Sequence, residues 1–378
     1  AIRIMRIAVD ARSAYVADRR GIGKTLVSLY RHAAALRPSW RFVMFHRATA
    51  GDDPFAGLAN VESRRIEMAG DRFGWWPRIR LPMAARSIRA DVLHCPANTG
   101  PGRPAAPMLL TLHDVIPLEP EGGHPDPRAW KRSVARPARA ARRIVTPSEY
   151  SRSRIIEAFG VPAENVEAIP WGVDEPWASA GDASEIRRVR SECGLGDERP
   201  YVFAFAAEGP RKNTPRILEA WAKLPQAVRD GHTLLLAGAQ PEAERRFRER
   251  AARLGLPGGC EIRGFVPEPD LRALVGGAEA MCYPSLSEGF GLPVLEAFAA
   301  GTAVLTSGTT SLPEVAGEAA VFVDPRSSED IARGLAELLS DEGLRRRLVE
   351  AGRRRLGQFT WDRCAERFCH AVEECASR

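Results

Sequence analysis

Two glutamates stand eight positions apart around a glycine-rich loop in the second half of the chain. Glu288 precedes the loop 289–291, and Glu296 lies about one turn inside a helix that Pro293 is expected to open. Glycines let a ligand approach the backbone closely, and the free amides at a helix N-terminus favour an anion. The pattern therefore predicts a phosphate site whose two carboxylates contact the hydroxyl-rich groups on either side.

A second loop carries two adjacent cations, Arg211 and Lys212. They follow an apolar run at residues 201–206 and precede a helix expected over residues 214–223. Two cations at a helix N-terminus supply the charge and the directed donors that a diphosphate requires. A solvated Arg-Lys pair would explain this loop taken alone, but the glutamate loop further along the chain favours a shared site.

Three more candidates follow expected strands in the first half. Gly21 and Gly23 lie in the first β–α turn, where doubly wound folds bind phosphates, although a lone Gly-x-Gly is a weak indication. His113 and Asp114 follow the expected strand 108–112, at a strand end that favours a functional role over a structural one. His94 also ends an expected strand, and packing is as good an interpretation for it as ligand binding.

Apolar runs alternate with amphipathic helical stretches along the 378 residues, which is typical of parallel sheets covered by helices. The length exceeds that of one ordinary core. We therefore expect an α/β fold of two Rossmann-like domains, residues 1–175 and 176–359, with a capped helix over residues 360–378 that begins at Thr360. The expected strands lie near residues 4–9, 42–46, 92–94, 108–112, 144–146, 166–169, 201–206, 233–237, 261–263, 280–283, 303–306 and 320–323.

Several classes of protein are excluded or disfavoured by composition. No run of eighteen apolar residues occurs, so no membrane-spanning helix is predicted. The first residues include arginines and are interpreted as a strand, not a signal peptide, which predicts a cytoplasmic protein. Seven cysteines without a Cys-x-x-Cys pair predict free thiols. No metal is expected, because no Asp-x-Asp pair is present, and no nucleic-acid module is recognised.

Positive charge is concentrated in the first half, where residues 1–175 carry 27 Lys+Arg against 18 Asp+Glu. Five arginines recur three or four positions apart and predict one basic helix face, kinked at Pro137: Arg128, Arg132, Arg136, Arg139 and Arg143. An anionic lipid or an acceptor pyrophosphate would explain this face, and so would simple solvation. The segment 75–81 mixes tryptophan with arginine, either as an interfacial segment or as tryptophans packed under a surface helix.

Together these motifs resemble the signatures of the retaining glycosyltransferases of family 4, which have the GT-B fold. The resemblance is dense over residues 281–325 and reaches the first half at isolated motifs, including residues 145–151 and 170–174. Ala206 stands where the family often has glycine, and Trp171 where many members have asparagine. The GT-B fold implies two Rossmann-like domains facing a central cleft, with the last helix crossing back to the N-terminal domain.

The resemblance also implies a reaction. A hexose, with mannose from GDP-mannose as the first expectation, would move from a nucleotide diphosphate sugar to a saccharide or polyprenyl-linked acceptor in polysaccharide biosynthesis, with retention and without a metal. A nucleotide-sugar epimerase or hydrolase of the same fold would use the same loops. So would a non-catalytic protein that binds a nucleotide sugar. An anionic membrane surface is a possible peripheral partner.

Roles for individual residues follow from the same resemblance. Arg211 and Lys212 would bind the diphosphate, Glu288 would orient the sugar, and Glu296 would accept hydrogen bonds from the ribose. His113 would contact the transferred sugar. The remaining donor contacts are expected from Gly21, Gly23, Gly289, Phe290, Gly291 and Leu292, and the acceptor contacts from Asp114 and His94.

Overall fold

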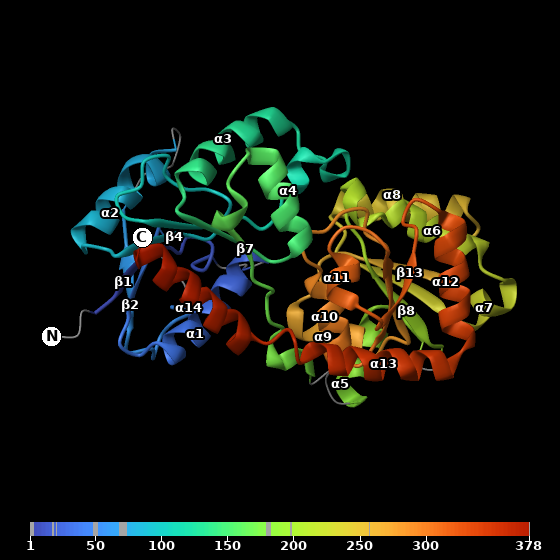
Figure 1. The fold of residues 1–378 in the computed structure, drawn as a ribbon. Coiled ribbons are helices and arrows are strands. Elements are labelled where there is room, and N and C mark those ends of the chain that lie inside the picture. The colour runs from blue at the N-terminus through green and yellow to red at the C-terminus, as the bar shows by residue number, and fades with distance from the viewer. Residues whose placement is uncertain are drawn as a thin grey trace. The chain divides into compact units, whose positions relative to one another are not determined.

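The computed structural model describes residues 4–16, 19, 21–47, 52–67, 74–178, 183–196, 199–256 and 258–377. The chain divides into two units (Figure 1). The first contains residues 1–118, 124–172 and 360–378, and the second contains residues 119–123 and 173–359. The short segment 119–123 thus belongs to the second unit, although it precedes the predicted boundary after residue 175.

The first unit is built on a seven-stranded parallel sheet of order β3-β2-β1-β4-β5-β6-β7. One of these strands, β3, was not predicted. Its residues 61–65 are Val-Glu-Ser-Arg-Arg. This polar sequence gave no strand signal, and the structure tolerates it because β3 lies at the edge of the sheet. The strands are β1 (Arg6–Asp10), β2 (Arg41–His46), β3 (Val61–Arg65), β4 (Val92–Cys95), β5 (Met108–Thr111), β6 (Arg143–Thr146) and β7 (Val166–Ala168).

Helices cover both faces of this sheet. On one face Tyr30 packs edge-on against Phe42 and Phe368, which joins α1 (Ile22–Leu36), β2 and α14 (Trp361–Ser377). On the other face Leu81, Val134 and Phe159 share one apolar cluster. They belong to α2 (Leu81–Ser87), α3 (Pro127–Ala140) and α4 (Glu149–Phe159). The shorter helical segments of this unit are η1 (Trp76–Arg80), η2 (Ile116–Leu118) and η4 (Ala163–Asn165).

The last helix, α14, is part of the first unit. Thr360 Oγ1 accepts a hydrogen bond from the backbone nitrogen of Arg363 at 3.3 Å, which confirms the predicted N-cap. Glu373 forms an ion pair at 3.2 Å with Arg37, the residue that directly follows α1. The three cysteines of α14 are buried, as expected for small core residues: Cys364, Cys369 and Cys375.

The predicted row of five arginines is partly wrong. Arg143 is not on the helix, because α3 ends at Ala140 and Arg143 begins β6. There it is paired with Glu167 at 3.1 Å and with Glu374 at 2.5 Å. The helix continues through Pro137, which is buried. Among the described residues, no helix is both long and apolar enough to cross a bilayer.

The second unit is built on a six-stranded parallel sheet of order β10-β9-β8-β11-β12-β13. The strand order reverses between β8 and β11, as it does between β1 and β4 in the first unit. Ligands of open α/β sheets bind at such points, beyond the carboxyl ends of the strands. The strands are β8 (Tyr201–Phe205), β9 (Thr233–Ala237), β10 (Cys260–Arg263), β11 (Ala280–Tyr283), β12 (Ala303–Ser307) and β13 (Ala320–Val323).

The core of the second unit is apolar and continuous. Trp221, Phe247 and Leu335 come from three different helices and share one cluster with the central strands. The helices are α5 (Ala183–Glu192), α6 (Thr214–Lys223), α7 (Gln226–Gly231), α8 (Pro241–Arg253), α9 (Glu268–Gly276), α10 (Leu292–Ala299), α11 (Leu312–Ala316), α12 (Ser328–Ser340) and α13 (Glu342–Leu356). The 3-10 turns are η3 (Pro120–Gly122), η5 (Glu175–Ala178) and η6 (Pro210–Lys212).

Candidate active site

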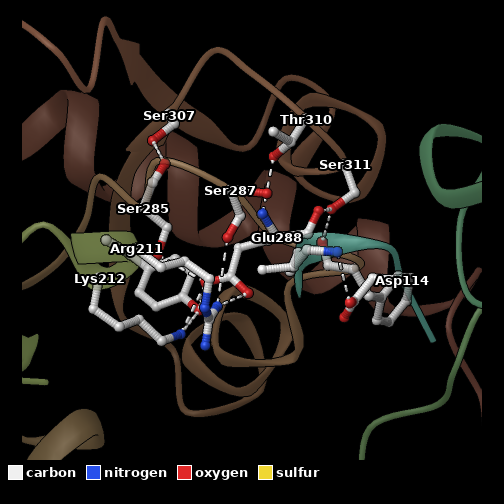
Figure 2. A network of polar contacts seen from close by, with 12 residues as sticks. Asp114, Arg211, Lys212, Ser285, Ser287, Glu288, Ser307, Thr310 and Ser311 are labelled. Carbon is white, nitrogen blue, oxygen red and sulfur yellow. Dashed lines mark hydrogen bonds and ion pairs between the residues drawn. The ribbon is translucent and has the colours of Figure 1, made fainter. Parts of the chain in front are cut away.

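Three loops at the carboxyl ends of β8, β11 and β12 converge where the strand order of the second unit reverses. In Figure 2 the side chains of Arg211, Lys212 and Glu288 point toward one another from the first two of these loops. The two predicted cations and the predicted sugar-orienting carboxylate therefore form one cluster.

Glu288 has a donor for both of its carboxylate oxygens. Oε1 accepts from Lys212 Nζ at 2.8 Å, from the Tyr283 hydroxyl at 2.6 Å and from Ser285 Oγ at 2.7 Å. Oε2 lies 2.5 Å from a guanidinium nitrogen of Arg211. The side chain of Glu288 is only 10% exposed. Burying a charge costs free energy unless the charge is paired, so these partners compensate the cost of burying the carboxylate.

The electrostatics of the cluster favour an ionised carboxylate. Burial raises the pKa of Glu288, but the charges of Lys212 and Arg211 outweigh it and hold that pKa at about 2. Burial also lowers the pKa of Lys212, and the charge of Glu288 opposes this shift. The pKa of Tyr283 is raised well above its usual value by burial, so its hydroxyl remains a donor at neutral pH.

The loop that carries the cations is anchored to the glutamate loop. Asn213 follows η6 with φ 62°, a left-handed conformation that asparagine tolerates. Its Nδ2 donates to the carbonyl oxygens of Pro284 at 2.9 Å and Pro325 at 2.6 Å. The carbonyl oxygen of Arg211 accepts from the backbone nitrogen of Leu286 at 2.8 Å. These bonds fix the cations relative to the carboxylate.

Gly291 occupies a position that only glycine fits. Its φ is +129°, and a Cβ placed there would lie 2.9 Å from Cδ2 of Leu312. Ser311 Oγ donates to the carbonyl oxygens of Glu288 at 2.9 Å and Phe290 at 2.6 Å, from the other side of the loop. The loop after β12 therefore supports the backbone of the glutamate loop.

The other candidates of this loop lie close to the cluster. Gly289 is in the loop, and Leu292 is the first residue of α10, so the helix opens with Pro293 in its first turn as predicted. Phe290 packs against Phe359, with ring centroids 5.9 Å apart. Glu296 is half-buried on α10, and its charge raises the pKa of Lys212 against the effect of burial.

Sequence reasoning missed the hydroxyl groups that hold Glu288. Tyr283 was assigned only to a strand, yet its side chain contacts both Glu288 and Lys212. Thr310 Oγ1 accepts from the backbone nitrogen of Glu288 at 3.3 Å. The position of Tyr283 at the last residue of a strand, directly before the motif, was a signal that could have identified it.

In the first unit, the predicted glycines lie at the start of α1. Gly21 has φ +33° and directly precedes the helix. A Cβ on Gly23 would come within 2.3 Å of the carbonyl oxygen of Ser13, in the segment that follows β1. Gly23 therefore permits close packing of this turn. Some residues of the same segment, 17, 18 and 20, lie outside the described chain.

His113 lines a pocket of the first unit with a defined tautomer. Its Nε2 is 2.7 Å from the carbonyl oxygen of Pro96, and because a carbonyl only accepts, Nε2 carries the hydrogen. Burial lowers the pKa of His113 to about 4. The neutral ring therefore offers Nδ1 as an acceptor for a ligand hydroxyl. The pocket is lined by Ile22, Thr25, Leu26, Leu29, His94, Pro96, Thr111, His113 and Trp171.

The two neighbours of His113 have structural partners. Asp114 Oδ1 accepts from the backbone nitrogen of Ile116 at 3.0 Å. The ring nitrogens of His94 are bonded to Tyr30 at 2.7 Å and to Thr111 at 2.8 Å, and the side chain is fully buried. Burial, followed by the charge of His113, lowers the pKa of His94 to about 3. Of the two interpretations of His94, the structure favours packing.

The fold and the site define a class of protein. Two doubly wound units, with paired cations and carboxylates at a strand-order reversal, are the GT-B architecture. Residues 19–176 match the family described as Glycosyltransferase Family 4, and residues 185–355 match the one described as Glycosyl transferases group 1.

Similar proteins extend the match over most of the chain. The O-antigen chain mannosyltransferase B of Escherichia coli is 27% identical over 371 residues, which cover 93% of this chain and 96% of the relative. The MMP alpha-(1->4)-mannosyltransferase of Mycolicibacterium hassiacum is 30% identical over 78% of this chain and 73% of the relative. The chain also matches longer E. coli mannosyltransferases, of whose length it spans about a third. It belongs to the glycosyltransferases of family 4.

Solved structures agree on the fold. The structure of Anabaena HepE in complex with UDP and glucose has a TM-score of 0.75 at 19% identity, and the match covers 98% of this chain and 100% of that one. At this identity the likeness shows the GT-B fold alone.

Proposed function

We propose that the protein is a retaining hexosyltransferase that moves mannose from GDP-mannose to a saccharide or polyprenyl-linked acceptor in polysaccharide biosynthesis. The observation that carries the proposal is the cluster in which Arg211 and Lys212 hold the ionised Glu288. Mannose is favoured because the relatives with the names given above are mannosyltransferases. We place the reaction in the cytoplasm, at the inner face of the membrane when the acceptor is lipid-linked.

The cluster has donors suited to a diphosphate. The ammonium of Lys212 has three N–H donors, of which Glu288 and Tyr283 accept two, and no described residue accepts the third. Arg211 has a planar guanidinium, in which two N–H groups can donate to two phosphate oxygens at once. If both cations donate to oxygens of the diphosphate, they would stabilise the negative charge that develops on it as it leaves.

The chemical step that we propose is a same-face displacement. The bond from the anomeric carbon to the phosphate oxygen breaks, the acceptor oxygen bonds to the same carbon on the same face, and the acceptor proton passes to the departing phosphate. Glu288 orients the sugar and Glu296 accepts from the ribose hydroxyls. His113, neutral at physiological pH, accepts from a hydroxyl of the transferred sugar through Nδ1.

We further propose that transfer needs no metal ion, because Arg211 and Lys212 supply positive charge at the diphosphate. The first experiment compares thermal stabilisation by GDP, UDP, ADP and dTDP and by their mannose or glucose conjugates, each with and without EDTA. A ligand present at about a hundred times its dissociation constant should add ~2.7 kcal/mol to the free energy of unfolding. Stabilisation by GDP and GDP-mannose, unchanged by EDTA, is the expected result.

Product analysis then tests the reaction itself. Incubation of GDP-mannose with mannosyl acceptors, followed by NMR of the new anomeric centre, should show an α-linked product from the α-linked donor. Free sugar or an altered nucleotide sugar formed without an acceptor would instead indicate a hydrolase or an epimerase. Donor binding without turnover on any acceptor would indicate a binding protein, and either outcome would overturn the proposed transfer.

A further inference from the structure

Three large apolar side chains are exposed along the helical segment formed by η1 and α2. Trp75, Ile79 and Met83 are 54%, 45% and 57% exposed. They recur every four residues through η1 and α2, so they lie on one side of the segment. Trp76 and Leu81, which lie between them in sequence, are buried in the core. The segment therefore anchors itself with one apolar face and exposes a second apolar stripe.

The outer face of α3 carries five exposed cations. No described residue forms an ion pair or a side-chain hydrogen bond with any of them: Arg128, Lys131, Arg132, Arg136 and Arg139. At 3.6 residues per turn, the five side chains fall within about 140° of the helix circumference. The opposite face, with Val134 and Ala138, is buried. We call these five residues the cation row.

The cation row differs from other charged helices of this protein. On α12, Arg333 lies between Asp330 at 2.8 Å and Glu337 at 3.1 Å. On α13, Arg353 is 3.0 Å from Glu350. In contrast, α3 contains no acidic residue between Pro127 and Ala140. Like charges on neighbouring turns repel one another, so an external anion would stabilise the row.

The apolar stripe and the cation row lie on the same side of the first unit. Leu81 of α2 and Val134 of α3 share one core cluster, so both helices cover the same face of the sheet (Figure 1). Arg86, near the end of α2, is also exposed and forms no ion pair with a described residue. Any partner of this side must therefore accept apolar side chains and carry negative charge over the width of two helices.

We propose that this side of the first unit docks on an anionic lipid bilayer. Trp75, Ile79 and Met83 would enter the boundary between headgroups and acyl chains, and the cation row would contact anionic headgroups. A bilayer satisfies both requirements at once. A second copy of the chain would bring a second cation row against the first, and an acidic polyanion would leave the apolar stripe in water. Docking would bring the enzyme to a lipid-linked acceptor, and this part of the inference rests on the proposed function.

The test measures binding of the full chain to vesicles by co-sedimentation, without donor or acceptor. One vesicle set is phosphatidylcholine alone, and the other is equimolar phosphatidylcholine and phosphatidylglycerol. The cation-row variant is the triple change Arg128→Gln, Arg132→Gln and Arg139→Gln. Its control removes three exposed arginines that form no ion pair with described residues of the second unit, by Arg245→Gln, Arg253→Gln and Arg354→Gln. Both variants lose the same net charge.

The expected result is binding to the anionic vesicles and not to phosphatidylcholine. Since each basic residue near such a surface strengthens binding about fivefold, the cation-row variant should bind about 100-fold more weakly, and the control much less so. Replacing Ile79 and Met83 by serine should weaken binding at least tenfold. Phe265→Ser, which removes an exposed apolar side chain of the second unit, should not.

Three outcomes would overturn the docking proposal. They are absence of binding to anionic vesicles, equal binding to both vesicle sets, and equal losses in the cation-row and control variants. If light scattering showed a dimer that the same substitutions dissociate, a second copy would be the partner. Transfer to a water-soluble acceptor should be unchanged in the variants, so failure of transfer and failure of docking are separable.

Discussion

The hydroxyl of Tyr283 donates to the same oxygen of Glu288 that Lys212 contacts, at 2.6 Å and 2.8 Å respectively. Tyr283 also accepts from Lys212, so the three side chains form a closed triangle of hydrogen bonds. Ser285 Oγ donates to the same oxygen. A carboxylate oxygen that accepts from three donors leaves the side chain little freedom to rotate. The triangle therefore fixes the direction in which Glu288 and Lys212 face an incoming nucleotide sugar.

We expect Tyr283→Phe to lower kcat/KM about tenfold, because the carboxylate and the ammonium lose the partner that orients them. The loss of a buried hydroxyl should also cost about 1 kcal/mol of stability. The matched control is Tyr201→Phe, in the same unit, whose buried hydroxyl donates to the carbonyl oxygen of Leu274 at 2.6 Å. Steady-state kinetics that showed equal losses for both variants would contradict a positioning role for Tyr283.

Lys212→Ala should lower kcat/KM at least 100-fold, since it removes a donor that would act on the developing phosphate charge. It also leaves Glu288 with fewer partners, so we expect about 3 kcal/mol of destabilisation. Adding Glu288→Gln removes the buried charge that has lost one of its two cationic partners, and should restore part of the stability without restoring transfer. A double-mutant cycle from denaturant unfolding and initial rates checks both halves of this expectation. Turnover that survived in both single variants would refute the assignment of the site.

Gly291→Ala should destabilise the second unit by more than about 1 kcal/mol and reduce transfer, because φ is +129° and the new Cβ would meet Leu312 at 2.9 Å. Gly209→Ala provides the control in the neighbouring loop. Its φ is −65°, and no atom lies within 4 Å of an added Cβ. The unfolding temperature and the donor affinity should therefore stay near the wild-type values in Gly209→Ala, and both should fall in Gly291→Ala.

The buried histidines of the first unit should make the protein sensitive to mild acid. Burial lowers the pKa of His113 from 6.5 to about 4 and that of His94 to about 3. Between these values and 6.5 the unfolded chain binds more protons than the folded one, so the free energy of unfolding falls as the pH falls. Denaturant titrations from about pH 7.5 to about pH 4.5 should show this slope.

His113→Asn should flatten part of that slope. His370→Gln serves as the control, because the side chain of His370 is 67% exposed, whereas His113 lines a pocket. A slope that His113→Asn leaves unchanged would show that the acid sensitivity has another origin.

Much of the candidate site was predicted from the sequence because its signals are local. The glycines, the adjacent cations and the two glutamates stand in short segments whose order along the chain reports strand, loop and helix start. Other elements were missed for equally physical reasons. β3 is an edge strand whose residues 61–65 need not alternate in polarity, and Arg143 continued a helical spacing although the helix ends at Ala140.

The sequence by itself determined the alternation of strands and helices, the family and the residues that carry charge at the site. Only the tertiary structure decided which of these residues meet. Tyr283 ends β11 and Glu288 lies in the loop after it, whereas Lys212 lies in the loop after β8. The contact of Lys212 with the other two residues therefore depends on β8 and β11 pairing as neighbours in the sheet. In the same way, the burial of His94 between Tyr30 and Thr111 arises because α1, β4 and β5 pack together. Composition and spacing report local periodicity, whereas desolvation and hydrogen-bond partners are set by segments that are distant in the chain.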